Sequence, residues 1–237
     1  MKRILLLFVL LCTIFGTIEA NGELPQYIGL QLGYARPITR LNAPTQDHKT
    51  LNANPYNGLK AGFVYDATLI KGFGFSLAVN YTFGYNATSW ASQYSTSIYP
   101  KARTRTFYHQ IEIPCDWQYK FEIAKSTWLI LYSGPTLQYG VSMVRHQDIQ
   151  DDAKVVTQGK LVNLYDTQSA EDYALKHLNV TWGVGAGFQY DRYFLRGGYD
   201  FGLINPYQAA GFNGKDINTK GRFDQWQIKL GIYLWEF

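Results

Sequence analysis

Two thirteen-residue segments of this chain alternate strictly between apolar and small or polar residues. In residues 73–85 (FGFSLAVNYTFGY), every odd position is aromatic or large and aliphatic, and every even position is small or polar. Residues 178–190 (LNVTWGVGAGFQY) repeat the pattern with apolar residues at the even positions. Alternation of this kind gives a β-strand one apolar and one polar face. A soluble strand typically has about 5–6 residues, whereas a tilted strand that crosses a membrane needs about 9–11.

We expect eight strands of this kind, joined by connections that are alternately long and short. The expected strands are 26–36, 58–70, 73–85, 104–121, 127–145, 178–190, 193–204 and 223–234. The short turns lie near 71–72, 122–126 and 191–192, and the long loops near 37–57, 86–103, 146–177 and 205–222. Outer-membrane barrels have short periplasmic turns and long external loops. The sequence therefore predicts an all-β fold, an eight-stranded antiparallel up-and-down transmembrane β-barrel with both chain ends on the periplasmic side.

The pairing of two neighbouring strands can be predicted from the faces of their residues. A two-residue turn at 191–192 places Arg196 opposite Gly187 on one face and Trp182 opposite Phe201 on the other. A slip of one residue would mix the polar and apolar faces. We therefore expect this register for the hairpin.

The first twenty residues have the pattern of a secretory signal peptide. Lys2 and Arg3 precede a compact apolar run at 4–14, and Ala20 offers a cleavage site. We therefore expect residues 1–20 to be a signal peptide and 21–237 to be the barrel. No later segment approaches the ~18 consecutive apolar residues of a transmembrane helix.

The inward face of the predicted barrel collects charges of both signs. An eight-stranded barrel is only wide enough for side chains to fill it. We expect a filled polar interior in which every charge has a partner, because an unpaired buried charge is costly. A narrow conducting path is the alternative. The charged residues of this expected network are Lys60, Asp66, Glu112, Asp116, Arg196, Asp200 and Lys229, and Lys120 shares their face.

Three positions interrupt the regular pattern of the expected strands. Pro114 faces inward and Pro135 outward at nearly the same height of one hairpin, and proline cannot donate to the hydrogen-bond ladder. We expect a shared bulge or a widened spacing there. Near the C-terminus the apolar phase that includes Leu234 passes to Glu236, so a bulge or an early strand end is expected.

Short motifs of the central and penultimate strands resemble a known family. They are residues 111–114 (IEIP), 119–121 (YKF), 134–140 (GPTLQYG) and 199–205 (YDFGLIN). Together they resemble the outer-membrane β-barrel domain of Bacteroidetes, often called PorT-like. The resemblance covers about residues 26–237, and it implies an outer-membrane barrel without catalytic residues.

Motifs that would indicate chemistry are weak in this sequence. The glycines at 183–187 share one strand face and precede no helix, so they do not predict a nucleotide loop. His146 and His177 lie in one long loop with Asp148, Asp151 and Asp152, but no two histidines of the chain have a metal-ligand spacing. We expect no catalytic, cofactor-binding or metal site.

Two alternatives to a structural or binding barrel remain open on the sequence. A barrel that modifies lipids would need Ser or Asp near a histidine such as His109 at the outer rim. A soluble lipocalin-like barrel would need its large apolar side chains inside. A net charge of +4 without a Lys/Arg run does not indicate nucleic-acid binding.

The expected location is the bacterial outer membrane, with lipid around the barrel wall. The polar loop from His146 to His177, which carries Lys154 and Glu171, is the expected contact for a protein or surface ligand. A terminal aromatic residue is common in outer-membrane proteins, and Phe237 is expected to be recognised by the barrel-assembly machinery.

Overall fold

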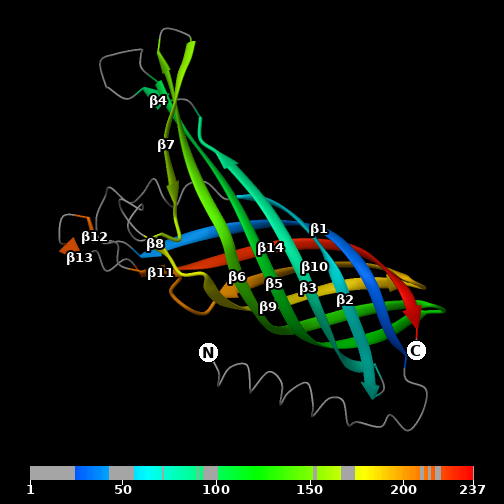
Figure 1. Ribbon diagram of the computed structural model, residues 1–237. Coiled ribbons are helices and arrows are strands. Elements are labelled where there is room, and N and C mark those ends of the chain that lie inside the picture. The colour runs from blue at the N-terminus through cyan, green and yellow to red at the C-terminus, as the bar shows by residue number, and fades with distance from the viewer. Residues whose placement is uncertain are drawn as a thin grey trace.

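Eight long antiparallel strands form a closed ring in the computed structural model (Figure 1). The structure describes residues 25–42, 56–70, 72–89, 91–92, 101–151, 154–166, 174–208, 211–212, 215–216 and 220–236. The ring strands are β1 (Gln26–Asn42), β2 (Asn57–Ile70), β3 (Phe73–Ala87), β5 (Lys101–Ala124), β6 (Thr127–Asp151), β9 (Leu178–Tyr190), β10 (Tyr193–Gly202) and β14 (Lys220–Glu236). Each pairs with the next ring strand, and β1 pairs with β14 to close the ring. The predicted fold class is confirmed, while the predicted signal peptide and Phe237 lie outside the described residues.

Short turns join the strands at one end of the barrel, which we call the short-turn end. Gly72, Ser126 and Asp191 have positive φ there, with values of 85°, 59° and 51°. Tight hairpins need such φ values because their twist must match that of the strands. The register of β9 and β10 is the predicted one, with Arg196 opposite Gly187. Within the described residues, no helix is long and apolar enough to span a membrane.

The barrel carries its large apolar side chains on the outside. Leu32, Leu59 and Phe63 are 68%, 69% and 66% exposed, whereas the charged residues of the inward phase are buried. A protein with polar groups inside and apolar side chains outside is unstable in water. The same arrangement is the expected one in a bilayer, where the outer face contacts lipid. This arrangement rules out the lipocalin-like alternative, which requires the opposite orientation.

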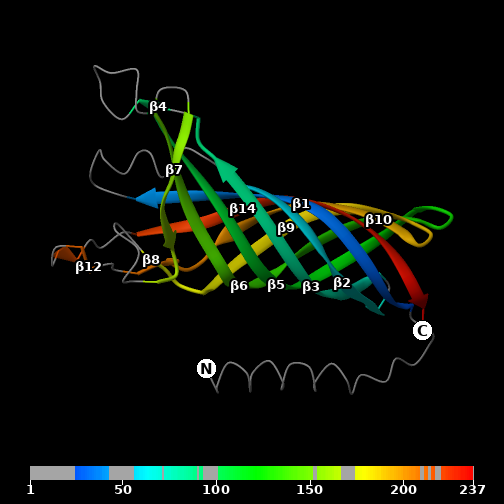
Figure 2. The same ribbon diagram turned by 45° about the horizontal axis from the view of Figure 1, so that its top comes forward.

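Two ring strands continue beyond the barrel at the opposite end, the long-loop end. There β4 (Ala91–Ser92) pairs with β5, and β7 (Lys154–Asn163) pairs with β6. We call this four-stranded extension, residues 91–92, 101–109, 142–151 and 154–163, the blade. Both ribbon views show it leaning away from the barrel axis (Figures 1 and 2).

The blade corrects the predicted loops at 86–103 and 146–177, because much of each is strand. The sequence at 101–106 (KARTRT) alternates charged and small or β-branched residues. Threonine favours strands, but the segment lacks the apolar residues on which the strand prediction depended. Small strands complete the long-loop end, namely β8 (Ala174–Leu175), β11 (Tyr207–Gln208), β12 (Gly211–Phe212) and β13 (Lys215–Asp216).

The prolines interrupt pairing without shifting it. Pro114 lies opposite Thr136 and Trp117 opposite Ser133, so the register is the same on both sides of the interruption. The bulge expected at Pro114 and Pro135 is therefore absent, and the pairing lapses instead because proline has no N–H to donate. The two register shifts of this hairpin lie elsewhere, between His109 and Gln110 toward the long-loop end and between Glu122 and Ala124 at the short turn.

The last ring strand contains the irregularity that its sequence predicts. Gly29 pairs with Tyr233 and Ile28 pairs with Trp235, so Leu234 is an extra residue in β14. This bulge brings Trp235 to the exposed face, where its side chain is 60% exposed.

Candidate functional site

The part of the barrel interior nearer the short turns contains a network around one carboxylate. Asp66 contacts Arg196 Nη2 at 2.5 Å and Lys120 Nζ at 2.9 Å, and it accepts a hydrogen bond from the Tyr233 hydroxyl at 2.6 Å. Gln118 Nε2 donates at 2.5 Å to Oδ1, the same carboxylate oxygen that Lys120 contacts. The side chain of Asp66 is 0% exposed. Two cations and two neutral donors therefore compensate its burial.

A second network lies further toward the long-loop end. Lys60 pairs with Glu112 and donates to Gln227 Oε1 at 2.6 Å. Thr82 Oγ1 donates to Glu112 at 3.0 Å, and Gln227 Nε2 donates to Asp200 at 2.8 Å. The barrel cross-section is thus occupied by side chains that hold one another.

Asp116 and Lys229 attract each other electrostatically without forming a close ion pair. Both are buried, at 4% and 2% exposure, yet within the described part of the chain neither forms an ion pair or a side-chain hydrogen bond. The nearby cations Arg196 and Lys60 are held by Asp66 and Glu112. Lys229 Nζ instead lies 5.8 Å from the ring centroid of Tyr132, a cation–π contact. All seven predicted network residues are therefore buried, and Asp116 and Lys229 interact with each other only beyond ion-pair distance.

An apolar cap closes the long-loop end over these networks. Its buried members are Tyr108 and Met143 from the ring and Leu164, Leu175 and Tyr207 from the connections. Leu175 N donates to Leu164 O at 2.7 Å, and β8 pairs with β11, so main-chain bonds hold the cap. The cap was not predicted, because the polar residues of 146–177 indicate a solvated loop. The isolated apolar pairs Leu164-Tyr165 and Ala174-Leu175 were the available signal.

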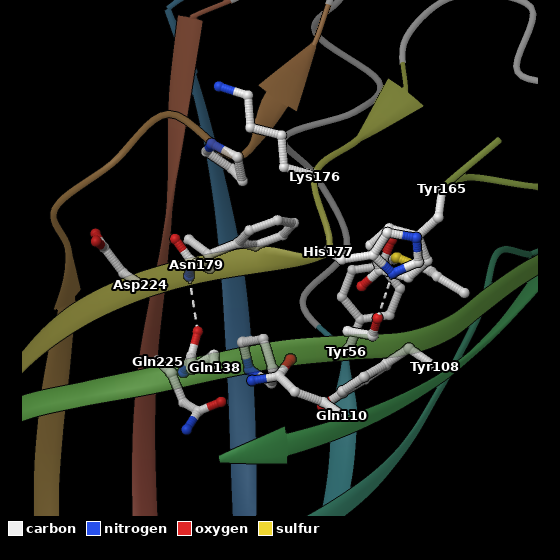
Figure 3. A pocket seen from close by; sticks show the side chains of 15 residues that line it. Tyr56, Tyr108, Gln110, Gln138, Tyr165, Lys176, His177, Asn179, Asp224 and Gln225 are labelled. Atoms are coloured by element: carbon white, nitrogen blue, oxygen red, sulfur yellow. Dashed lines mark hydrogen bonds between the residues drawn. The ribbon is translucent and has the colours of Figure 1, made fainter. Parts of the chain in front are cut away.

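A cavity of about 40 Å³ separates the cap from the polar interior (Figure 3). Asn179 Nδ2 donates to Gln138 Oε1 at 2.7 Å, and the His177 Nδ1 atom lies 2.7 Å from Gly140 O. Tyr165 stacks on His177 with ring centroids 4.4 Å apart. Burial raises the pKa of Tyr165 to about 12, so this ring stays neutral at pH 7.

The lining of this cavity identifies what it can hold. The Tyr108 hydroxyl and Asn179 Oδ1 are buried without a hydrogen-bond partner among the described residues. A water needs about 10–15 Å³ of accessible space and two to four polar partners. The cavity therefore suits one or a few waters and is too small for an organic substrate.

The histidines that the sequence analysis considered lie apart from one another. The His109 Nδ1 atom lies 2.5 Å from the Tyr81 hydroxyl on the outer face, His146 packs edge-on against Phe107, and His177 lies in the cap. Within the described residues, no three His, Cys, Asp or Glu side chains are placed to hold a metal ion. The hydroxyl residue opposite His109 is Ser142, and no hydrogen bond joins them.

Two pairs of arginines, each bound to one carboxylate, lie on the outer face at the long-loop end. In the blade cluster, Arg103 Nε and Arg105 Nη2 contact Asp148 at 2.8 and 2.7 Å. Desolvation acts to raise the pKa of Asp148, but the hydrogen bonds and charges of Arg105 and Arg103 outweigh it and hold the pKa below its usual range.

The rim cluster repeats this arrangement on β1 and β14. Arg40 Nε and Arg222 Nε contact Asp224 at 2.6 and 3.2 Å. The Tyr199 hydroxyl and Gly202 N also donate to Asp224, each at 3.1 Å. Neither cluster was predicted, because each brings together residues of two strands that are far apart in the chain, Arg103 with Asp148 and Arg40 with Asp224.

Comparison with known proteins identifies a family and similar solved structures for this architecture. Residues 25–208 match the outer membrane protein beta-barrel domain family. Two solved structures to which the chain is similar are Ail, the attachment invasion locus protein of Yersinia pestis, and Neisserial surface protein A. Ail is 9% identical, with 90% of this chain and 100% of that chain covered and a TM-score of 0.42. Neisserial surface protein A is 12% identical, with 88% and 97% covered and a TM-score of 0.35. No curated protein sequence matches the chain.

Proposed function

Because the chain belongs to the outer membrane protein beta-barrel domain family, and so to the outer membrane, we propose that it is a closed barrel that acts through its extracellular surface. In this proposal the long-loop end is extracellular and the short-turn end periplasmic. The protein carries out no chemistry, and its role is structural, binding or accessory.

The observation that carries the proposal is the double closure of the barrel. The network around Asp66 lies across the interior above a hollow of about 510 Å³ at the short turns, and the apolar cap covers the opposite mouth. An ion crossing this interior would have to separate buried ion pairs and also displace the cap. Separating a buried pair costs about 3–5 kcal/mol, which disfavours a narrow pore.

A planar-bilayer recording tests the closure. The full chain, folded in detergent and inserted in a phospholipid bilayer, is expected to give no stable current steps in 1 M KCl. A double variant, Leu164→Asp with Leu175→Asp, places charges in the cap and serves as the comparison. Stable single-channel steps from the unaltered chain would contradict a closed barrel and support the narrow pore.

The partners follow from the same orientation. The outer wall contacts outer-membrane lipid, and the blade and cap offer the surface for a protein or surface ligand. Strand β14, together with Phe237, which lies outside the described residues, is the proposed signal for the barrel-assembly machinery. Rigid scaffolds commonly present recognition surfaces in this way.

The finer relationship and the export route are part of the proposal. The motifs at 111–114, 134–140 and 199–205 support a PorT-like barrel of Bacteroidetes, and residues 1–20 support export by a signal peptide. N-terminal sequencing of the mature protein is expected to begin at Asn21. A mature chain that retained residues 4–14 would contradict the signal peptide.

A further inference from the structure

The blade and rim clusters each retain a positive charge on an exposed surface. Their carboxylates are buried, with side-chain exposures of 3% for Asp148 and 0% for Asp224. The arginines remain accessible, at 33% and 26% for Arg103 and Arg105. Each cluster combines two guanidinium groups with one carboxylate, so its net charge is +1.

Both clusters lie two residues along a strand from aromatic side chains of the outer face, on the side of the long-loop end. Arg105 is two residues from Phe107, which packs on Tyr85 with ring centroids 5.1 Å apart. Asp224 is two residues from Trp226, which packs on Tyr34 at 5.3 Å. Two residues along a strand span about 6.6 Å. Aromatic girdles mark the membrane interface, so the clusters lie at the level of the lipid headgroups.

The blade cluster lies on the strand face that contacts lipid lower in the barrel. Arg103 and Arg105 continue the odd-numbered phase of β5, the phase that faces lipid lower in the barrel at Trp117 and Tyr119. The blade leans away from the barrel axis in both ribbon views (Figures 1 and 2). Both arginines therefore lie on the outer face of the blade, in line with the lipid-facing side chains of β5.

The two clusters lie on opposite sides of the ring. The rim cluster is on the adjacent pair β1 and β14, and the blade cluster is on β5 and β6, four positions away in the eight-stranded ring. One cluster therefore cannot serve the lipid that the other contacts.

We propose that the blade and rim clusters bind phosphate groups of outer-leaflet lipids. A guanidinium presents parallel N–H donors that match phosphate oxygens, and it keeps its charge at all relevant pH values. In each cluster the buried carboxylate fixes the two guanidinium groups before a phosphate arrives, which lowers the entropy lost on binding. Arg36, on the same face of β1 as Arg40, adds a buried Nε that lacks a hydrogen-bond partner among the described residues.

Lipid retention measured by native mass spectrometry tests the proposal. The full chain in detergent is mixed with diphosphoryl lipid A, and the adducts are counted. We expect two retained lipids for the unaltered protein. Juxtamembrane Lys or Arg residues contribute about 1 kcal/mol each, so loss of a pair is expected to weaken its site about 30-fold.

The variants remove one cluster at a time. Arg103→Gln with Arg105→Gln is expected to lose one adduct, and Arg40→Gln with Arg222→Gln the other. Lys125→Gln with Arg192→Gln removes the same charge at exposed short turns and is expected to retain both. A mobility shift on boiling shows that each variant is folded. If a Gln pair prevents folding, the Arg→Lys pair is used. It keeps the positive charge and removes the parallel N–H donors of the guanidinium.

Each other outcome overturns the proposal. Unchanged retention in both arginine variants would show that the clusters only join the strands. Equal retention of dephosphorylated lipid A would assign binding to the acyl chains. Displacement of lipid A by an equal concentration of inorganic phosphate would indicate a site for free phosphate. The proposal requires the membrane location but not a closed barrel, so a conducting barrel that still retains lipid A would refute only the closed-barrel function.

Discussion

At the scale of single residues, Asp66 is the central acceptor of one ion-pair network in the barrel interior. Its carboxylate is the shared acceptor of Arg196 and Lys120, and all three side chains are almost completely buried. We expect Asp66→Asn to lower the free energy of unfolding by about 3–5 kcal/mol, because it leaves buried cations without a counter-charge. The measurement is urea unfolding in phospholipid vesicles, followed by Trp fluorescence.

The control for this variant is the same substitution at an exposed site. Asp191→Asn lies in a short turn, where asparagine tolerates the positive φ of 51°. It is expected to change the unfolding free energy by less than about 0.5 kcal/mol. Equal effects of the two substitutions would show that the Asp66 network does not stabilise the barrel.

Some interior glycines leave space into which an aromatic ring packs, and Gly84 is the clearest case. A Cβ atom at Gly84 would overlap the ring of Tyr108, a member of the apolar cap. We expect Gly84→Ala to destabilise the protein by about 1–3 kcal/mol through overpacking. Adding Tyr108→Leu, which removes the ring, is expected to recover part of this loss.

Gly197→Ala is the matched control because a Cβ there meets only Gln227 O, at an ordinary 3.9 Å. The same unfolding measurement is expected to show little change for this variant. A Gly84→Ala protein as stable as Gly197→Ala would mean that the Tyr108 ring moves aside without loss.

At the scale of elements, the blade depends on Asp148. Arg103 and Arg105 hold its pKa below the ordinary 3.8, so the unfolded blade binds the proton more readily than the folded one. This stabilisation is therefore complete above pH ~4 and is lost as the pH falls through the lower pKa of the folded state. Hydrogen exchange of blade amides is expected to stay slow at pH 5, after correction for intrinsic rates, and to accelerate below pH ~4.

Asp148→Asn is the comparison, because it removes the titrating group. Its blade is expected to exchange faster at pH 5 and to lose the dependence on pH. If the unaltered protein and Asp148→Asn followed the same pH profile, another group would be responsible.

The ring strands and the bulge in β14 could be predicted from the sequence, whereas the blade could not. The ring strands were predictable because a bilayer outside and a polar interior impose opposite residues on alternate positions, as in 73–85. The bulge at Leu234 was predictable from the same alternation, since its phase breaks there. The blade was not, because residues 101–106 lie beyond the hydrocarbon core of the bilayer and nothing forces apolar residues onto them.

The candidate sites show the same division. The burial of Asp66 and Arg196 follows from strand phase, but their contact joins residues 130 apart and depends on ring geometry. Asp224 lies in the lipid-facing phase yet is buried, because Arg40, Arg222 and Tyr199 from three strands cover it. Phase alone could not predict that arrangement.

At the scale of the whole molecule, an even number of strands in a closed ring places all short turns at one end and the blade and cap at the other. Lys125 lies in a short turn, and Lys176 is exposed beside the cap. In a background with Cys115→Ala, we expect Lys176→Cys to react with a membrane-impermeant maleimide on intact cells. Lys125→Cys is expected to react only after the outer membrane is permeabilised. A mobility shift on boiling confirms that each labelled chain is a folded barrel, since closed barrels resist detergent until heated. Labelling of Lys125→Cys on intact cells, with Lys176→Cys protected, would invert the barrel and place the blade, and both arginine clusters, on the periplasmic side.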